Sequence, residues 1–407
     1  MDRLLSRRGQ PLDCLDYIEA IGSRRPNTAR DDNSPSVHNF FTEAHASGAT
    51  LCWRQIALME YSLMDIELIL DSDWDPQQVA EIAVEAEKAG VRTIWHSNIT
   101  NTWDPFIGLV PAALATSKIK LGVLAISPYE MHPLKIANAI LSLNELANGR
   151  AIVALGGGGA VALNIVDDLD FKKMRIVRGV REAAEIIYLI ASGNFYAGYP
   201  GGVFKLTKPS RMKYCKAPRP RIFTCSMGPQ MLRMGGRIAD GLQVGDVPPG
   251  RMEEVMEDIQ TGLSQRQYPA EDFRISNFWA WHIKKDREAS MHEARCQLFA
   301  RAEVIRPNIG LEHVCNEAEA QIVKDNFMSF MMANITRSGE IKDVPESLVE
   351  HLIKEVSSAG DFGDIDREVE RYREFEKSGL TDLALRIFDD PMGNLKTIKE
   401  RVMPHFT

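Results

Sequence analysis

The sequence lacks three features that would assign it to a familiar class of proteins. Its 407 residues contain no apolar run near the ~18 residues that cross a bilayer, and the N-terminus has no hydrophobic core typical of a signal peptide. The six cysteines are scattered without C-x-x-C spacing, so neither a metal site nor a disulfide framework is indicated. A net charge of −8 argues against nucleic acid as the main partner. We expect a cytoplasmic protein that acts on a small molecule.

Acidic residues are also missing from one long stretch. Between residues 186 and 239 there is no Asp or Glu. The same stretch carries nine basic residues, which are Lys205, Lys208, Arg211, Lys213, Lys216, Arg219, Arg221, Arg233 and Arg237. The stretch indicates either a site for an anionic ligand tail or a solvated basic loop whose counter-charges lie elsewhere in the fold.

From residue 55 onward, short apolar runs alternate with helical patterns. Strands are predicted at residues 55–61, 91–96, 118–127, 151–155, 220–225, 241–245, 276–283 and 380–388. Eight strands joined by crossover helices must be parallel and buried on both faces. The pattern predicts a single α/β domain over residues 55–407, a (β/α)₈ TIM barrel with a helical insertion, roughly residues 300–376, before the last strand. Residues 1–54, which include a polar segment rich in turn formers, are predicted to form a separate N-terminal extension.

Helix signals are clearest at residues 75–90. Asp75 is a candidate N-cap, Pro76 suits the first helical position, and Gln78 completes a capping box. Gly90 is a suitable C-terminal residue.

Four consecutive glycines follow the fourth predicted strand in "AIVALGGGGAVALN" (residues 151–164). Function in a (β/α)₈ barrel is located at the carboxyl ends of the strands, which is where these glycines are expected. Backbone without side chains can approach a flat ring or a phosphate closely. A tight turn with no ligand explains the glycines equally well.

Three ordered segments resemble the bacterial-luciferase-like flavin and deazaflavin oxidoreductases. They are "DPFIGLVPAALATSKIKLGVLAISPYEMHP", "ELANGRAIVALGGGG" and "PRPRIFTCSMGPQMLRMGGRIADG". The resemblance runs from about residue 55 to residue 406. It implies a TIM-barrel oxidoreductase that commonly forms homo-oligomers.

Within this superfamily, the chain is most similar to the methylenetetrahydromethanopterin reductase branch, which uses the deazaflavin coenzyme F420. The resemblance implies that "IALMEY" places Glu60 at the end of the first strand as a catalytic acid, and that "LGVLAISPY" carries a non-prolyl cis peptide bond between Leu124 and Ala125 behind the cofactor ring. It implies further cofactor contacts from the glycine loop, which comprises Gly156, Gly157, Gly158 and Gly159 and extends to Asn164. Ser226, Met227 and Gly228 would form the phosphate loop.

The chain departs from the family after the second strand. Many deazaflavin relatives carry Asp-His there, and this chain has Asn98-Ile99. The missing imidazole argues against the alcohol oxidation of the sugar-phosphate dehydrogenase branch, while Asn98 can still hydrogen-bond a carbonyl of the cofactor ring system. His96 would point to the other face of the strand, and His132 is better interpreted as a helix-start residue.

Three functions follow from the resemblance. The first is hydride transfer from reduced F420 to an electrophilic carbon, such as that of a methylene-tetrahydropterin, and the basic stretch favours it because F420 carries a polyglutamate tail. The second is an FMN monooxygenase that takes reduced flavin from a partner reductase and activates oxygen. The third is a non-catalytic flavin-binding relative.

Overall fold

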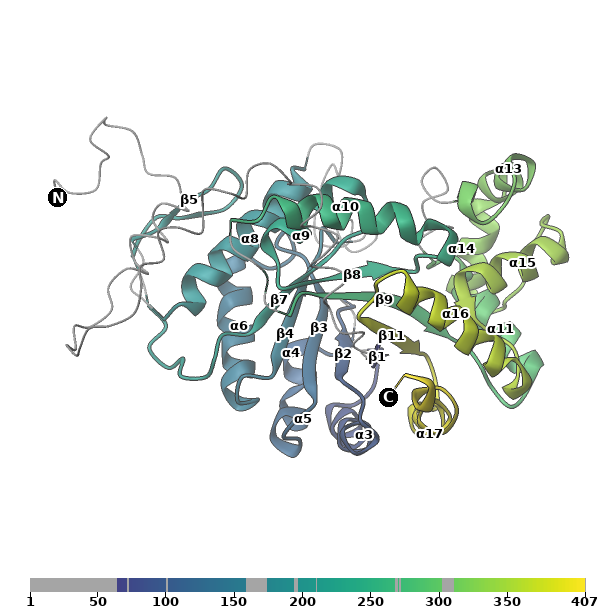
Figure 1. Ribbon diagram of the computed structural model, residues 1–407, viewed down its shortest axis with the longest axis horizontal. Helices are drawn as coiled ribbons and strands as arrows, with labels where there is room; N and C mark the ends of the chain where they lie inside the picture. The colour runs from purple at the N-terminus through teal and green to yellow at the C-terminus, as the bar shows by residue number, and fades with distance from the viewer. Residues whose placement is uncertain are drawn as a thin grey trace, which may run out of the picture. The chain divides into compact units, whose positions relative to one another are not determined.

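The computed structural model describes residues 64–71, 73–99, 102–158, 174–193, 197–209, 211–267, 270, 272–301 and 311–406. Eight parallel strands form a closed barrel in the order β1-β2-β3-β4-β7-β8-β9-β11, and pairing of β11 with β1 completes the circle (Figure 1). Their bounds are β1 Asp65–Leu70, β2 Thr93–Ser97, β3 Lys120–Ile126, β4 Ala151–Leu155, β7 Arg221–Cys225, β8 Gly241–Gly245, β9 Arg274–Trp281 and β11 Asp382–Ile387. The predicted TIM barrel is therefore confirmed.

Helices surround the barrel and connect successive strands. They are α3 Pro76–Ala89, α4 Pro105–Gly108, α5 Val110–Ala115, α6 Pro133–Leu146, α8 Ile176–Ala191, α9 Pro229–Ile238, α10 Met252–Ser264, α11 Arg287–Leu298 and α17 Pro391–Arg401. The signals that predicted α3 are all present, since Asp75 and Gln78 form the capping box and Gly90 ends the helix with a left-handed φ of 88°.

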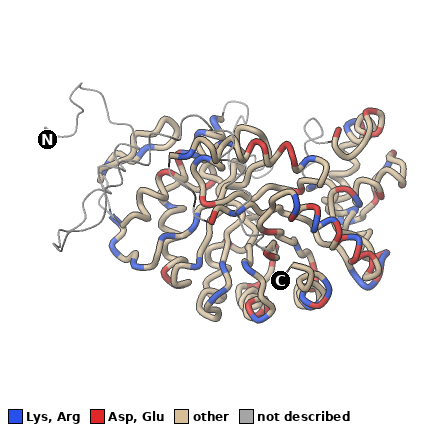
Figure 2. Tube along the Cα trace, in the orientation of Figure 1, with Lys and Arg blue, Asp and Glu red and all other residues tan. Residues whose placement is uncertain are grey.

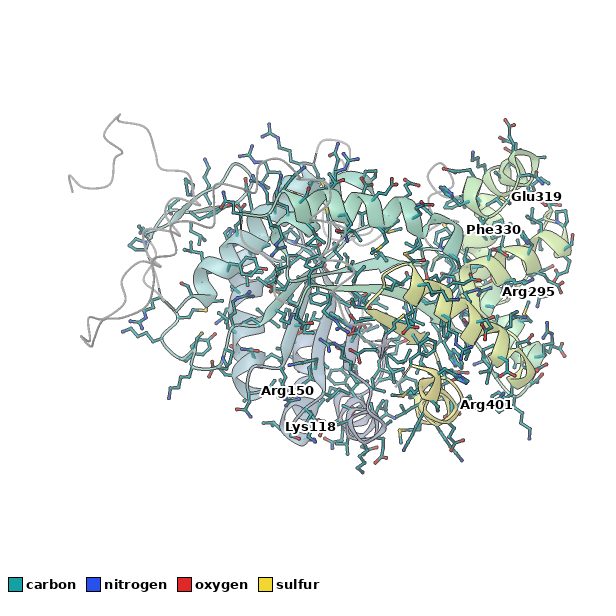
Figure 3. The ribbon with its side chains drawn as sticks, in the orientation of Figure 1. Lys118, Arg150, Arg295, Glu319, Phe330 and Arg401 are labelled. Atoms are coloured by element: carbon teal, nitrogen blue, oxygen red, sulfur yellow. The ribbon has the colours of Figure 1, made fainter. Side chains whose placement is uncertain are left out.

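The helical insertion before the last barrel strand is also confirmed. It contains α13 Glu317–Asp325, α14 Phe327–Thr336, α15 Glu346–Val356 and α16 Ile365–Lys377. Helices α11, α13, α14 and α15 contribute to a second hydrophobic core, which contains Leu352. Phe330 of this core is labelled in Figure 3. A short strand, β10 (Ser357–Ser358), follows α15 and pairs with β9. A small hairpin of β5 (Tyr199–Pro200) and β6 (Lys205–Leu206) lies between α8 and β7 in the sequence.

The position of the first strand is a correction. The sequence predicts this strand at residues 55–61, but the strand that pairs with β2 and β11 is β1, Asp65–Leu70. The run at 55–61 precedes this strand and lies outside the described residues, as does the predicted domain boundary after residue 54. The sequence did not predict a strand at "DIELIL" because Asp65 and Glu67 make this segment resemble a half-exposed one.

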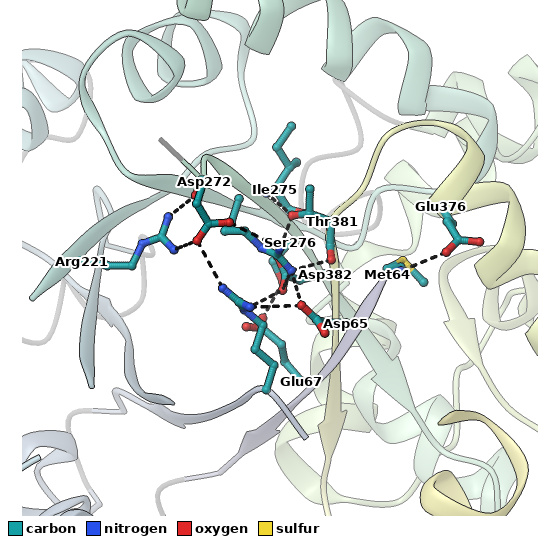
Figure 4. A network of polar contacts seen from close by, with 12 residues as sticks. Met64, Asp65, Glu67, Arg221, Asp272, Ile275, Ser276, Glu376, Thr381 and Asp382 are labelled. Carbon is teal, nitrogen blue, oxygen red and sulfur yellow. Dashed lines mark hydrogen bonds and ion pairs between the residues drawn. The ribbon is translucent and has the colours of Figure 1, made fainter. Parts of the chain in front are cut away.

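A network of ion pairs, of which Arg274–Asp382 is buried, crosses the amino-terminal end of the barrel (Figure 4). Arg274 on β9 donates to Asp382 on β11 at 2.6 and 2.8 Å and to Asp65 on β1 at 2.5 Å. Arg221 on β7 donates to Asp272 at 2.7 Å. This network links four strands at the end opposite to the one where function is expected.

Candidate functional site

The cis bond predicted behind the cofactor ring is present. The Leu124–Ala125 peptide is cis, and the pairing of β3 with β4 shifts register between Val123 and Ile126 as the bulge predicts. Asn98, just after β2, holds both carbonyls of this segment. Its backbone N–H donates to Leu124 O at 2.7 Å, and its side-chain Nδ2 donates to Ala125 O at 3.2 Å.

The glycine loop lies directly beside this bulge. Gly156 N–H donates to Ile126 O at 3.0 Å, and Ser127 Oγ donates to Gly157 O at 3.1 Å. A Cβ added to Gly156 would stand 3.4 Å from Ala125 Cβ and 3.5 Å from Cys225 Cβ. Gly156 is therefore buried between the ends of β3 and β7, where a methyl group would meet both strands at ordinary contact distance. Gly159 and Asn164 lie outside the described residues.

The other glycines of the loop have different local reasons. A Cβ at Gly157 would stand 2.5 Å from Ile176 Cγ2 on α8, so close packing excludes a side chain there. Gly158 has a φ of 81°, a left-handed conformation that favours glycine. Packing against α8 and a left-handed turn therefore account for Gly157 and Gly158, and the approach of a cofactor to this loop stays a prediction.

The predicted phosphate loop follows β7 and leads into α9. The Ser226 hydroxyl is directed into the protein, where it donates to Met231 O at 3.3 Å. Within the described part of the chain, the N–H groups of Met227 and Gly228 donate to no partner, and Gly228 caps α9 without a side-chain hydrogen bond. Backbone amides at a helix start are suited to an anion, so this loop would act through its backbone rather than through the Ser226 side chain.

The carboxyl group inside the barrel belongs to Glu67 on β1, a residue that the sequence analysis missed. Glu67 is 1% exposed. Its Oε2 accepts hydrogen bonds from Trp95 Nε1 at 2.8 Å and from Ser276 Oγ at 2.8 Å. Glu67 and Ser276 are labelled in Figure 4. Burial and the negative charge of Asp382 raise the pKa of Glu67 from 4.5 to about 7, against the opposing effect of these donors.

Glu67 is connected to the segment with the Leu124–Ala125 cis bond through Trp95. The Trp95 ring belongs to a hydrophobic cluster that contains Leu124 of the cis bond together with Ala154 and Phe223. A change in the charge of Glu67 therefore acts on a side chain that packs beneath the bulge. Glu60, the predicted acid, lies outside the described residues, and the strand-end position inferred for it is wrong because β1 begins five residues later.

Both histidines singled out in the sequence have structural surroundings. His96 points out of the barrel toward α4, where a Cβ on Gly108 would stand 2.4 Å from His96 Nε2. Burial lowers the pKa of His96. His132 is the N-cap of α6 and accepts from Leu134 N–H at 3.2 Å. Neither supplies the imidazole that is missing after Asn98.

Charged and aromatic side chains form the other half of the barrel mouth, and sequence reasoning missed them as well. Arg386 on β11 donates to Asp71, just after β1, at 2.5 and 2.9 Å, and its guanidinium lies 5.4 Å from the ring centre of Phe278. Buried Arg301 pairs with Asp246 at 2.8 Å and faces the same ring at 5.5 Å. These residues come from different parts of the chain, around β1, β8, β9 and β11, so no local pattern could reveal the cluster.

A small cavity of about 180 Å³ opens beside Asn98. Its lining combines polar and apolar residues, namely Asn98, Ile99, Thr102, Trp103, Asp104, Pro105, Ile126, Glu130 and Met131. Trp103 is 46% exposed, an unusual position for so large an apolar ring. This cavity adjoins the segment that carries the cis bond.

Part of the acid-free stretch has its counter-charges elsewhere in the fold, and binding of an anionic ligand tail by the rest stays a prediction. Arg219, Arg221 and Arg233 pair with Asp240, Asp272 and Asp258, so the counter-charges of these three lie elsewhere in the fold. Lys205, Lys208, Arg211 and Lys213 are exposed and form no ion pair within the described residues. Figure 2 shows the resulting run of basic residues, with few acidic neighbours, between β5 and β7.

Neither a metal centre nor a membrane span emerges from the described residues. No group of three or more His, Cys, Asp or Glu side chains in that part of the chain is arranged to hold a metal ion. None of the described helices is long and apolar enough to cross a membrane. The four described cysteines are free thiols, and burial raises the pKa of Cys225 to about 12, as suits a packing role.

Residues 62–382 match the family described as luciferase-like monooxygenase. The chain belongs to this family. Its members are flavin- or F420-dependent oxidoreductases, and the chain is an oxidoreductase of this luciferase-like class.

Individual members of the luciferase-like family align over much of their length. The chain is 26% identical over 324 residues to 5,10-methylenetetrahydromethanopterin reductase of Archaeoglobus fulgidus, covering 78% of this chain and 92% of the relative. It is 26% identical over 248 residues to F420-dependent glucose-6-phosphate dehydrogenase of Kineococcus radiotolerans. This alignment covers 54% of this chain and 73% of the relative.

Solved structures of the luciferase-like family share the fold. The coenzyme F420-dependent tetrahydromethanopterin reductase of Methanopyrus kandleri superposes with a TM-score of 0.67 at 23% identity, covering 85% of this chain and 100% of that one. A Baeyer–Villiger monooxygenase from Pseudomonas putida in complex with FMN superposes with a TM-score of 0.58 at 17% identity. This superposition covers 85% of this chain and 99% of that one.

Proposed function

We propose that this chain transfers hydride from reduced F420 to an electrophilic carbon of a methylene-tetrahydropterin. The support comes from the relatives that align along most of their length, which are methylenetetrahydromethanopterin reductases. Other relatives are F420-dependent glucose-6-phosphate dehydrogenases, and the site favours the reductase over this dehydrogenase chemistry.

The observation that carries this choice is the absence of an imidazole at the end of β2. In the described structure Asn98 and Ile99 follow the strand, and His96 faces outward against Gly108. Oxidation of an alcohol needs a base that takes up the hydroxyl proton, and histidine is the residue most often used for it. Reduction of a methylene carbon requires no such base, but it requires an acid that protonates the departing nitrogen.

The residues at the barrel mouth fit a flat cofactor ring. The cis segment of Leu124 and Ala125 would lie against one face of the ring, with the backbone of Gly156 beside it. The backbone of Met227 and Gly228 at the start of α9 would hold the phosphate. When bound, F420 supplies the hydride from C5 of its ring. Gly159, Asn164 and Ser226 remain predicted contacts.

Glu67 is the candidate source of the proton among the described residues, and because it is buried behind Trp95, its proton would reach the barrel mouth by relay and not by direct contact with the ligand. A general acid works best when its pKa lies near the working pH, and burial brings the pKa of Glu67 to about 7. Its contact with Trp95 connects the carboxyl to the packing beneath the cis bond. Glu60 remains a prediction, and the same experiment can test both residues.

The second candidate function is an FMN-dependent monooxygenase, favoured by the shared fold of the FMN-bound Pseudomonas putida enzyme. A flavin reductase would then be the required partner. In either case a homo-oligomer is expected from the resemblance to the family. A purely ligand-binding role is the third possibility, and it predicts cofactor binding without turnover.

Titration of the purified full-length chain with F420 and with FMN in separate absorbance experiments tests the choice of cofactor. The proposal predicts saturable binding of F420, followed by oxidation of bound reduced F420 when methylenetetrahydromethanopterin is added. Binding of FMN alone, with oxygen consumption by the reduced complex, would overturn it. If F420 binds but the pterin does not oxidise bound reduced F420, the proposed cofactor would stand and the proposed substrate would be wrong.

A further inference from the structure

The side-chain amide of Asn98 is held in one orientation. Its Nδ2 donates to Ala125 O at 3.2 Å and to Glu130 Oε2 at 3.1 Å, so both of its N–H bonds are used. A flip of the amide would bring Oδ1 against a carbonyl oxygen and a carboxylate oxygen at these distances, replacing two attractions by two repulsions. The surroundings therefore fix the Asn98 amide with its oxygen on the other side.

This orientation leaves Oδ1 as the available group of Asn98. No described residue donates a hydrogen bond to Oδ1, and Asn98 is only partly buried. Asn98 also lines the cavity of about 180 Å³, where Ile99, Ile126 and Met131 provide apolar surface. The sequence alone suggested that Asn98 could donate to a ring carbonyl, but the geometry uses both of its donors within the protein.

We propose that Asn98 Oδ1 accepts a hydrogen bond from an N–H or O–H group on the ligand that enters this cavity, and that Glu130 is the positioning residue that fixes the acceptor. The inference rests on the proposed function, which supplies two planar ligands that carry such donors, the cofactor ring and the pterin. An aspartate at position 98 would place a second negative charge about 3 Å from Glu130 and could not donate to Ala125 O. Glu130 therefore explains why an amide suits this position.

A rescue experiment tests the arrangement. We compare the wild type with N98D, E130Q, the double variant N98D/E130Q, and Met131→Leu as a control that lines the same cavity without a hydrogen bond. In N98D two carboxylates face each other, so the melting temperature should fall. In the double variant the amide introduced at position 130 can donate to the carboxylate introduced at position 98, so the melting temperature should recover. Met131→Leu should leave it unchanged.

Ligand binding to the same variants locates the donor. Dissociation constants are measured separately for F420, for FMN and for methylenetetrahydromethanopterin. N98D keeps an oxygen acceptor but loses the two donations that orient it, to Ala125 O and Glu130 Oε2. Repulsion from these two oxygens should turn the carboxylate away from the ligand, so we expect N98D to weaken one ligand about tenfold and the double variant to recover most of the affinity. A loss confined to the pterin assigns the donor to the substrate, and a loss confined to F420 or FMN assigns it to the cofactor.

Two results would overturn the inference. One is wild-type binding and melting in N98D, and the other is a double variant no better than N98D. A wild-type chain that binds neither F420 nor FMN would instead contradict the proposed function and the ligand contact, and the order of melting temperatures would still show whether Glu130 holds Asn98.

Discussion

At the scale of single residues, the carboxyl of Glu67 has the largest predicted effect on chemistry. Glu67→Gln keeps the size of the side chain and an oxygen that can accept from Trp95 and Ser276. If Glu67 supplies the proton, turnover should fall by roughly 10²–10⁴-fold while cofactor binding is retained. Single-turnover oxidation of bound reduced F420 by the pterin measures the effect. Glu60→Gln is the matched control, and a loss in that variant alone would return the acid role to Glu60.

The same residue predicts a pH dependence of stability. The pKa of Glu67 is about 7 in the folded chain and 4.5 ordinarily, so the folded state binds the proton more tightly. The contribution of Glu67 to the free energy of unfolding should therefore fall by on the order of 3 kcal/mol as the pH rises from about 4.5 to about 7. At higher pH this contribution should change little. Chemical denaturation across this pH range should show a smaller fall in the free energy of unfolding for Glu67→Gln than for the wild type. An identical pH profile would contradict the assigned environment.

The partners of Glu67 explain why the sequence did not identify it. Trp95 lies 28 residues away and Ser276 lies 209 residues away, so the burial of the carboxyl follows only from barrel closure. Asn98 and the Leu124–Ala125 cis bond could be predicted from the sequence because they occupy positions in the motifs shared with the luciferase-like family. The contact of Asn98 with Glu130 depends on how the loop after β3 folds back, which no spacing rule specifies.

At the scale of elements, the glycine loop yields a prediction that separates folding from binding. A methyl group at Gly156 meets Ala125 and Cys225 at ordinary contact distances, so Gly156→Ala should fold with a nearly unchanged melting temperature. The methyl group would occupy the surface where the cofactor ring is proposed to lie, so F420 affinity should fall at least about tenfold. Unchanged affinity would place the ring elsewhere.

Gly157 in the same loop should behave in the opposite way. An alanine there would collide with Ile176 Cγ2, so Gly157→Ala should lower the free energy of unfolding by about 1–3 kcal/mol. Ile176→Leu removes the methyl branch at that position, and the double variant should regain part of the loss. Equal stability of the single and double variants would show that α8 does not constrain this loop.

Local signals predicted the elements unequally. The ends of α3 follow from Asp75, Gln78 and Gly90, because capping depends on residues adjacent in sequence. The first strand was misplaced because two neighbouring segments are apolar, and β1 carries two acids, of which the barrel encloses Glu67 while Asp65 is partly exposed at its end. Their placement depends on Arg274 and Trp95 from other strands, which the local pattern does not contain.

At the scale of the whole molecule, the distribution of basic residues predicts how a charged cofactor tail is bound. Lys205 lies in the β5–β6 hairpin, and Lys208 follows it in the sequence. Phe204 of the same hairpin contacts Tyr129 in the loop after β3. The segment with Arg211 and Lys213 instead continues along α6, where Tyr214 bonds with Asn138. Replacing Lys205 and Lys208 by Ala should weaken F420 more than a tailless analogue, by roughly fivefold.

The pair Arg211 and Lys213 is the matched control, since their replacement removes the same charge from the segment that runs along α6. Isothermal titration at two salt concentrations would compare the variants. Equal losses for F420 and for the tailless analogue would mean that the basic stretch contributes only to the general surface potential.

The central claim is that this member of the luciferase-like family reduces a pterin with F420. The most direct measurement is rapid mixing of the wild-type chain, loaded with reduced F420, with methylenetetrahydromethanopterin, while the absorbance of oxidised F420 is followed. The account predicts formation of one equivalent of oxidised F420 per bound cofactor together with the methyl product, and the same result without oxygen. Formation of oxidised cofactor only in the presence of oxygen, with no methyl product, would contradict it.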